Sequence, residues 1–199
     1  MNTQSMTFKD LAEEYKYTIK IPRIQRDYAQ GRKNAQKIRE KFVKDLFESL
    51  KNDKTLHLQF VYGSVKNGND FIPLDGQQRL TTLYLLHWYI AMRNNTTESY
   101  LANFTHETRS SSKEFCKALS KNTITIKNST DISATIKDQA WFLPFWEQDP
   151  TIQSMLTMLD SIHTQAIKSS PDTPMLECFY KNLDKLTFSF IKADTKLEK

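Results

Sequence analysis

The run Leu83–Met92 constrains the fold of this chain more than any other feature. It belongs to a segment that begins at Leu80, in which apolar residues occur around the whole circumference of a helix. The run is about half of the ~20 residues needed to cross a bilayer and contains His87, so we expect no membrane span. The sequence therefore predicts a buried helix over 80–92, around which the core is built.

The segment before this helix alternates between helical and strand patterns. Phe8, Leu11 and Tyr15 recur at helical spacing behind a capping Thr7. The run Asn67-Gly68-Asn69 is a strong turn signal between two strands and predicts a hairpin. The expected elements are helices over 7–16 and 33–50 and strands over 17–21, 56–65 and 70–74.

After residue 95 the chain changes character, because loops rich in Ser, Thr and Asn separate short helical runs. These runs are expected over 113–120, 133–147, 150–167 and 173–184. Residues 186–191 alternate like a strand, but we expect no partner for it, since only a polar tail follows. The sequence predicts an α+β fold with a small mixed sheet and packed helices in residues 1–95, followed by a mainly helical extension over 96–199.

The composition is that of an ordinary soluble domain, with 39% apolar and 26% charged residues. The N-terminus lacks the basic-then-apolar order of a secretory signal. The two cysteines, Cys116 and Cys178, form no spaced framework. We therefore expect a cytoplasmic protein whose thiols are reduced.

The net charge of +5 is carried by the N-terminal part of the chain. Residues 1–60 hold 13 Lys and Arg against 8 Asp and Glu, whereas the remaining 139 residues hold 15 of each. The excess lies over residues 23–41, where Arg23, Arg32 and Lys33 are our candidates for contact with nucleic acid. An ordinary solvated helix face would give the same pattern, so both interpretations stay open.

The segment Asp75-Gly76-Gln77-Gln78-Arg79 joins a predicted strand to the buried helix. Glycine allows a sharp turn and a close approach of a ligand, and the first amides of the helix suit an anion such as phosphate. Arg79 could hold a phosphate with two donors, and Asp75 could orient Mg²⁺ or water. The two glutamines could contact a base or a ribose. A turn, a helix cap and an Asp–Arg pair would explain the same residues.

Two motifs resemble those of a known family. Residues 21–28 read Ile-Pro-Arg-Ile-Gln-Arg-Asp-Tyr and residues 75–82 read Asp-Gly-Gln-Gln-Arg-Leu-Thr-Thr. They resemble the "IPxYQRxY" opening and the "DGQQRLTT" signature of the N-terminal domain of GmrSD-type restriction proteins, also called domain of unknown function family 262. Residues 60–65 look like the "LGS" strand of that family. The resemblance is good over residues 8–95 and general beyond them.

This resemblance implies a core similar to the ParB and sulfiredoxin fold, with a nucleotide bound at the loop before a helix. It implies an NTPase that uses Mg²⁺ and licenses a nuclease to cut foreign, often modified, phage DNA. The implied catalytic residues are Asp75, Gln77, Gln78 and Arg79. The implied nucleotide-binding residues are Gln25, Arg26, Gly76 and Arg79, with Asp75 as the metal ligand.

The chain departs from the family pattern at two positions. Ile24 stands where an aromatic residue is usual and Gln30 where Trp is frequent, so no stacking role is implied there. A nuclease motif is missing, because none of the four histidines stands in a metal-nuclease context. The resemblance therefore implies that a nuclease domain or subunit outside this chain cuts the DNA.

Two other functions compete with the NTPase. A non-enzymatic, ParB-like DNA-binding module would use the basic face over 23–41, and the loop would then be structural. Sulfiredoxin-like thiol repair needs a cysteine beside the phosphate loop, and neither Cys116 nor Cys178 is near it in sequence. The aromatic cluster Trp141, Phe142, Phe145 and Trp146 is expected to pack in the core rather than stack on DNA.

Overall fold

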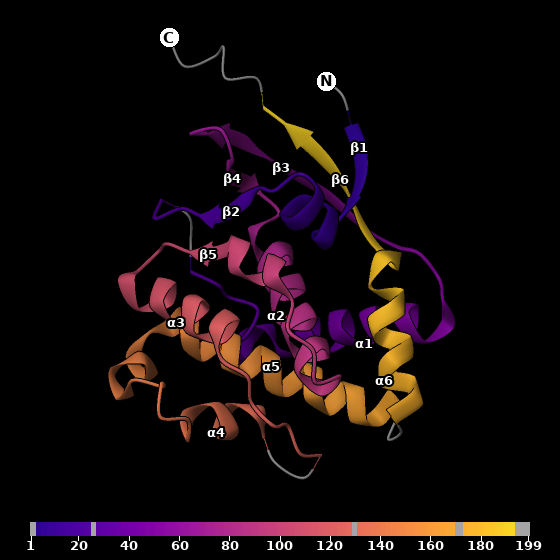
Figure 1. The fold of residues 1–199 in the computed structure, drawn as a ribbon, viewed down its shortest axis with the longest axis vertical. Coiled ribbons are helices and arrows are strands. Elements are labelled where there is room, and N and C mark those ends of the chain that lie inside the picture. Colours follow the sequence, from indigo (N-terminus) through magenta and orange to yellow (C-terminus); the bar gives the residue numbers. More distant parts are fainter. Residues whose placement is uncertain (1–2, 25–26, 129–130, 170–172, 194–199) are drawn as a thin grey trace.

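The computed structural model contains one mixed sheet and a group of helices (Figure 1). It describes residues 3–24, 27–128, 131–169 and 173–193. The strands are β1 (Thr3–Thr7), β2 (Thr18–Ile21), β3 (Leu56–Lys66), β4 (Asp70–Asp75), β5 (Phe104–His106) and β6 (Leu186–Lys192). The α-helices are α1 (Gln36–Asn52), α2 (Gln77–Arg93), α3 (Ser110–Lys121), α4 (Ile132–Lys137), α5 (Pro150–Ser169) and α6 (Thr173–Lys181). Short helices of other types are η1 (Asp10–Glu14), η2 (Lys33–Ala35), η3 (Ser99–Asn103), η4 (Pro144–Gln148) and η5 (Asn182–Lys185). The predicted α+β class is confirmed, whereas the kinship with the ParB and sulfiredoxin folds stays a prediction.

The strands form one sheet in the order β1-β6-β3-β4-β2-β5. β6 lies between β1, to which it is antiparallel, and β3, to which it is parallel. Our prediction that this strand has no partner was wrong. The alternation itself was informative, since Leu186, Phe188 and Phe190 are buried and need a sheet position that only distant strands supply. The division near residue 95 stays a prediction, although β6 brings the end of the chain into the sheet.

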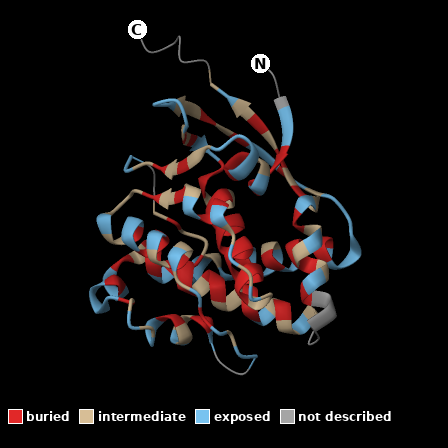
Figure 2. Ribbon diagram, viewed as in Figure 1, coloured by how far each residue is buried: buried red, intermediate tan, exposed pale blue. Residues whose placement is uncertain are grey.

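The predicted central helix is confirmed as α2, which is buried along most of its length (Figure 2). Several of its polar side chains form hydrogen bonds inside the core. The Tyr84 hydroxyl donates to the carbonyl of Cys116 at 3.0 Å, and Trp88 Nε1 donates to the carbonyl of Leu119 at 2.9 Å. His87 hydrogen-bonds the Tyr100 hydroxyl at 2.9 Å, and burial lowers its pKa to about 3. His87 is therefore a neutral core residue.

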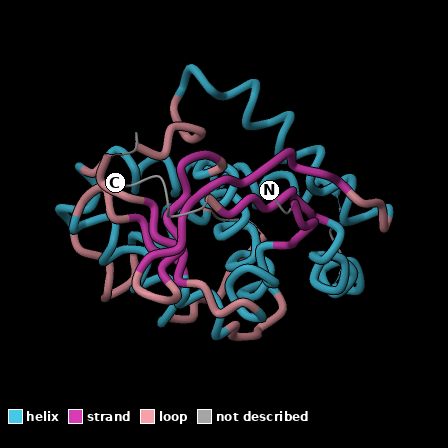
Figure 3. The backbone as a smooth tube through the Cα atoms, turned by 90° about the horizontal axis from the view of Figure 1, so that it is seen from above, coloured by secondary structure: helices cyan, strands magenta, loops and turns pink. Residues whose placement is uncertain are grey.

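The helices of the second half pack on those of the first. α5 contacts both α1 and α2, and α6 also contacts these two helices. In the view from above, the strands form one group with helices around it (Figure 3). Among the described residues, no helix has the length and apolar character needed to span a membrane.

Several predicted helices differ from the structure in their extent, and the one expected over 173–184 is divided into α6 and η5. The run expected over 133–147 is divided into α4 and η4, because Pro144 begins a new short helix. In the aromatic cluster there, Phe142 and Trp146 pack edge-on against Phe115, as expected for core residues, whereas Phe145 is exposed. At the N-terminus, residues 3–7 form β1 before the first helical turn.

Candidate functional site

The loop between β4 and α2 makes its turn at a glycine. Gly76 has a φ of 88°, a value that side chains with a Cβ resist. A Cβ at this position would lie 2.8 Å from Val61 Cγ2 and 3.1 Å from Val61 Cα. The site thus requires glycine both for the turn and for the close approach of β3.

The start of α2 is not capped by a side chain. The Asp75 carboxylate accepts a hydrogen bond from the Gly76 amide at 2.7 Å, but no side chain caps the amides of the first helical turn. The residues that carry these amides line a pocket of about 380 Å³, here called the loop pocket, together with Ala29, Gln30, Ala35, Ile38 and Asp75. A helix of this length with open amides in a pocket is suited to an anion.

Arg79 lies at one side of the loop pocket and is held by β3. Its Nη1 donates to Gln59 Oε1 at 2.9 Å and its Nη2 donates to the Phe60 carbonyl at 2.6 Å. Nη2 also lies 3.6 Å from Asp75 Oδ2, so the simple pairing that sequence analysis left open is present. Among the described residues, the buried Nε of Arg79 has no hydrogen-bond partner.

The two glutamines have different environments. Both ends of the Gln78 amide are occupied, since Oε1 accepts from the Ala29 amide at 2.8 Å and Nε2 donates to the Asp27 carbonyl at 3.2 Å. Gln77 is only 7% exposed and lines the loop pocket, and its Oε1 has no partner among the described residues. The Gln78 amide is therefore used for contacts within the protein, while Gln77 is the glutamine available to a ligand.

The first turns of α2 bring the two sequence motifs together. Besides the Gln78 contacts, Thr82 Oγ1 donates to Gln30 Oε1 at 2.6 Å and lies 2.8 Å from the Tyr28 hydroxyl. The segment 27–30 is thus fixed against α2, and its residues Ala29 and Gln30 form one wall of the loop pocket. Gln25 and Arg26, which were expected to close the pocket, lie outside the described residues.

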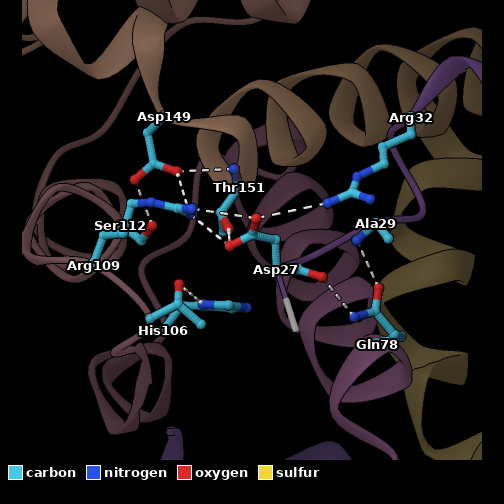
Figure 4. Close-up of polar contacts among 10 residues, drawn as sticks. Asp27, Ala29, Arg32, Gln78, His106, Arg109, Ser112, Asp149 and Thr151 are labelled. Atoms are coloured by element: carbon cyan, nitrogen blue, oxygen red, sulfur yellow. Dashed lines mark hydrogen bonds and ion pairs between the residues drawn. The ribbon is translucent and has the colours of Figure 1, made fainter. Parts of the chain in front are cut away.

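A cluster of charged residues that sequence analysis missed lies behind this wall (Figure 4). Arg109, just before α3, pairs with Asp27 at 2.6 Å and lies 3.5 Å from the buried Asp149. Asp149 accepts from Ser111, Ser112 and Thr151, and so caps the start of α5. The Arg109 guanidinium holds the pKa of Asp27 below its ordinary value. Only the Asp-Pro pair before a helix was a local signal for any of these residues.

Fewer basic residues are exposed over residues 23–41 than the sequence predicted. Arg23 and Lys33 are exposed, and Arg32 is half-exposed and lies 3.6 Å from Asp27. Arg39 is buried, and it donates to Ser161 Oγ at 2.9 Å and to the Gln30 carbonyl at 2.9 Å. Arg39 therefore joins α1 to α5 and does not contribute to a surface for nucleic acid.

The described residues beside the loop pocket fit a magnesium ion only if a bound phosphate supplies further ligands. Among the described residues, no group of three His, Cys, Asp or Glu side chains could hold a metal ion. The Asp75 carboxylate is 58% exposed beside the loop pocket. Mg²⁺ is commonly held by one or two carboxylates together with substrate phosphates. Asp75 would thus hold the ion only together with a phosphate ligand.

Comparison with known proteins gives one clear match. The family model described as "GmrSD restriction endonuclease, N-terminal domain" matches residues 8–199, and so extends through the helical second half. None of the curated proteins matches the chain.

Proposed function

From the premise that the chain belongs to the family of GmrSD restriction endonuclease N-terminal domains, we propose that it binds a nucleoside triphosphate with Mg²⁺ and hydrolyses it. In this proposal hydrolysis regulates a nuclease domain or subunit outside this chain, which cuts modified phage DNA. Because such a system acts on intracellular DNA, the proposal places the protein in the cytoplasm.

The observation that carries the proposal is the meeting of the two distant motifs beside one anion-suited pocket. The uncapped start of α2 lines the loop pocket on one side, and Ala29 and Gln30 line it on another. The buried Gln77 lines it and retains unused hydrogen-bonding capacity. A buried polar group without a partner is costly in a folded protein, so this arrangement favours a bound polar ligand.

Different residues of the loop serve phosphate binding and hydrolysis. The α2 amides and Arg79 bind the phosphates, and Gln77 donates through its amide group, which can rotate to present either end. Water attacks the γ-phosphorus while the bond to the β–γ bridging oxygen breaks, giving the nucleoside diphosphate, inorganic phosphate and one proton released to solvent. Asp75 orients the water and helps to hold Mg²⁺, which when bound neutralises phosphate charge. Gln78 holds the segment 27–30, which carries the wall residues Ala29 and Gln30.

The alternative function, DNA binding by the basic face over 23–41, loses support because Arg39 is buried. Arg23, Arg32 and Lys33 remain as residues that could contact a DNA backbone, and Arg32 is already close to a carboxylate. Contacts of this kind would be weak and strongly dependent on salt.

Calorimetric titration of the full chain with each of the four common NTPs, with and without Mg²⁺, tests the proposal. We expect at least one NTP to bind, and more tightly with Mg²⁺. A Lys33→Ala variant serves as the control, since it should bind the NTP as the parent does. Absence of NTP binding together with salt-dependent DNA binding that Lys33→Ala weakens would replace the proposal by the DNA-binding alternative.

A further inference from the structure

A second pocket adjoins the loop pocket at Arg79. It has a volume of about 450 Å³ and lies between α1 and β3, and we call it the α1–β3 pocket. Arg79, Ile38 and Gln30 line both pockets. The two spaces are therefore neighbouring compartments with a shared boundary.

The two pockets differ in chemistry. The loop pocket presents helix amides and Arg79, whereas the α1–β3 pocket has an apolar wall formed by Ile38, Phe42, Leu56 and Leu58. The charged residues on its rim neutralise one another, since Lys41 Nζ lies 2.6 Å from Asp45 Oδ2. The α1–β3 pocket is suited to an uncharged, flat and partly apolar group, and not to a phosphate.

The boundary between the pockets is built by an irregular stretch of β3. The strand shifts register between His57 and Phe60, and Gln59 there has a φ of 61°, which is uncommon outside glycine. This irregularity directs Gln59 Oε1 to the guanidinium of Arg79 at 2.9 Å. Bulges and unusual backbone angles are concentrated beside functional sites, where they aim a side chain. Arg79 is thus fixed at the junction of a polar and an apolar compartment.

The exposure of Ile38 is a second indication that a ligand binds at this junction. Its side chain is 68% exposed on α1, although it faces both pockets. A ligand that extends through both compartments would cover it. A nucleotide has the matching layout, with a charged chain at one end and a flat base at the other.

We propose that the α1–β3 pocket holds the nucleoside of the NTP whose phosphates lie in the loop pocket. This inference rests on the proposed function. The base lies against the apolar wall, and Arg79 lies where the nucleoside joins the phosphates. The pocket volume is within the roughly 300–1,000 Å³ that is usual for small-molecule sites.

The test compares an NTP with inorganic tripolyphosphate, both with Mg²⁺, by calorimetry on the full chain. Phe42→Ala removes part of the apolar wall, and Leu56→Trp fills the pocket from β3. Each variant is expected to weaken NTP binding roughly tenfold, the size expected for loss of one large apolar contact. Tripolyphosphate affinity should not change, which also reports that the variants are folded. Phe145→Ala is the matched control, because Phe145 is exposed on η4 and lines neither pocket.

The decisive comparison is the NTP affinity of the variants. If Phe42→Ala and Leu56→Trp bind NTP as tightly as Phe145→Ala does, the nucleoside lies elsewhere and the inference is overturned while NTP binding stands. Equal affinity of the parent chain for NTP and tripolyphosphate also overturns it. If the parent chain binds neither ligand, the proposed function fails as well.

Discussion

Arg109 forms a two-point ion pair with Asp27, in which Nη1 lies 2.6 Å from Oδ1 and Nη2 lies 3.3 Å from Oδ2. Asp27 lies two residues before Ala29, which lines the loop pocket, and Arg109 precedes α3. The pair therefore ties the pocket wall to the helical second half of the chain. Its parallel geometry makes it stronger than a single-point contact.

The first prediction concerns the stability that this pair supplies. Asp27→Ala should lower the free energy of unfolding by about 1–2 kcal/mol, since Asp27 is mostly covered but Arg109 is partly exposed to screening water. Glu13→Ala is the control, because its pair with Lys9 is exposed and should contribute less than about 0.5 kcal/mol. Urea denaturation measures both, and equal losses would contradict the prediction.

The second prediction is a pH dependence from the same carboxylate. The hydrogen bond from Arg109 lowers the pKa of Asp27 below 3.8. A carboxylate with a lowered folded-state pKa stabilises the protein above its unfolded pKa, and this contribution is lost as the pH falls through the folded pKa. The free energy of unfolding should therefore fall less steeply for Asp27→Asn than for the parent below about pH 4. Parallel curves of the free energy of unfolding against pH for the parent and Asp27→Asn would contradict this prediction.

The third prediction separates the roles of Arg79 and Asp75. Arg79→Ala should weaken NTP binding thirtyfold to several-thousandfold, which corresponds to about 2–5 kcal/mol. Asp75→Ala should keep binding measurable but stop phosphate release, because it removes repulsion from the phosphates together with the group that orients water. Both variants are assayed with the nuclease partner present, and thermal unfolding checks that they fold. Hydrolysis at the parental rate in both would leave the loop with a structural role only, as a turn.

The fourth prediction isolates the close approach at Gly76. Gly68 and Gly76 have similar φ values, 84° and 88°, but a Cβ at Gly68 meets nothing within 4 Å. Gly68→Ala should cost about 1–2 kcal/mol from the backbone conformation alone. Gly76→Ala should cost a further ~1–3 kcal/mol because Val61 must move. Denaturation curves of the two variants would coincide if the contact with Val61 were unimportant.

The fifth prediction concerns Arg39, which the sequence placed on the basic face. Arg39→Ala should lower the free energy of unfolding by about 2–4 kcal/mol, since it removes a buried side chain and leaves two partly buried carbonyls without a donor. Lys37→Ala, on the exposed side of the same helix, should change it by less than about 0.5 kcal/mol. Similar free energies of unfolding for the two variants would indicate that the Arg39 side chain is exposed rather than buried.

Periodicity in the sequence was enough to predict the central helix and the loop before it. Every turn of α2 carries apolar residues, so burial was the only stable environment for it. The turn at Gly76 and the position of Arg79 after it are local, because they depend on residues adjacent in sequence. The two family motifs were likewise visible from the sequence alone.

Tertiary structure alone decided which partners these elements found. The alternation over 186–191 indicated a strand, but its place between β1 and β3 depends on pairing across nearly the whole chain. The pair of Asp27 with Arg109 spans 82 residues, and the contact of Arg39 with Ser161 spans 122. Helical spacing shows which residues share a face but not what lies against that face, so a buried arginine and an exposed one look alike in the sequence. The sequence therefore determined the local elements and the loop chemistry, and packing determined which side chains remained open to a ligand.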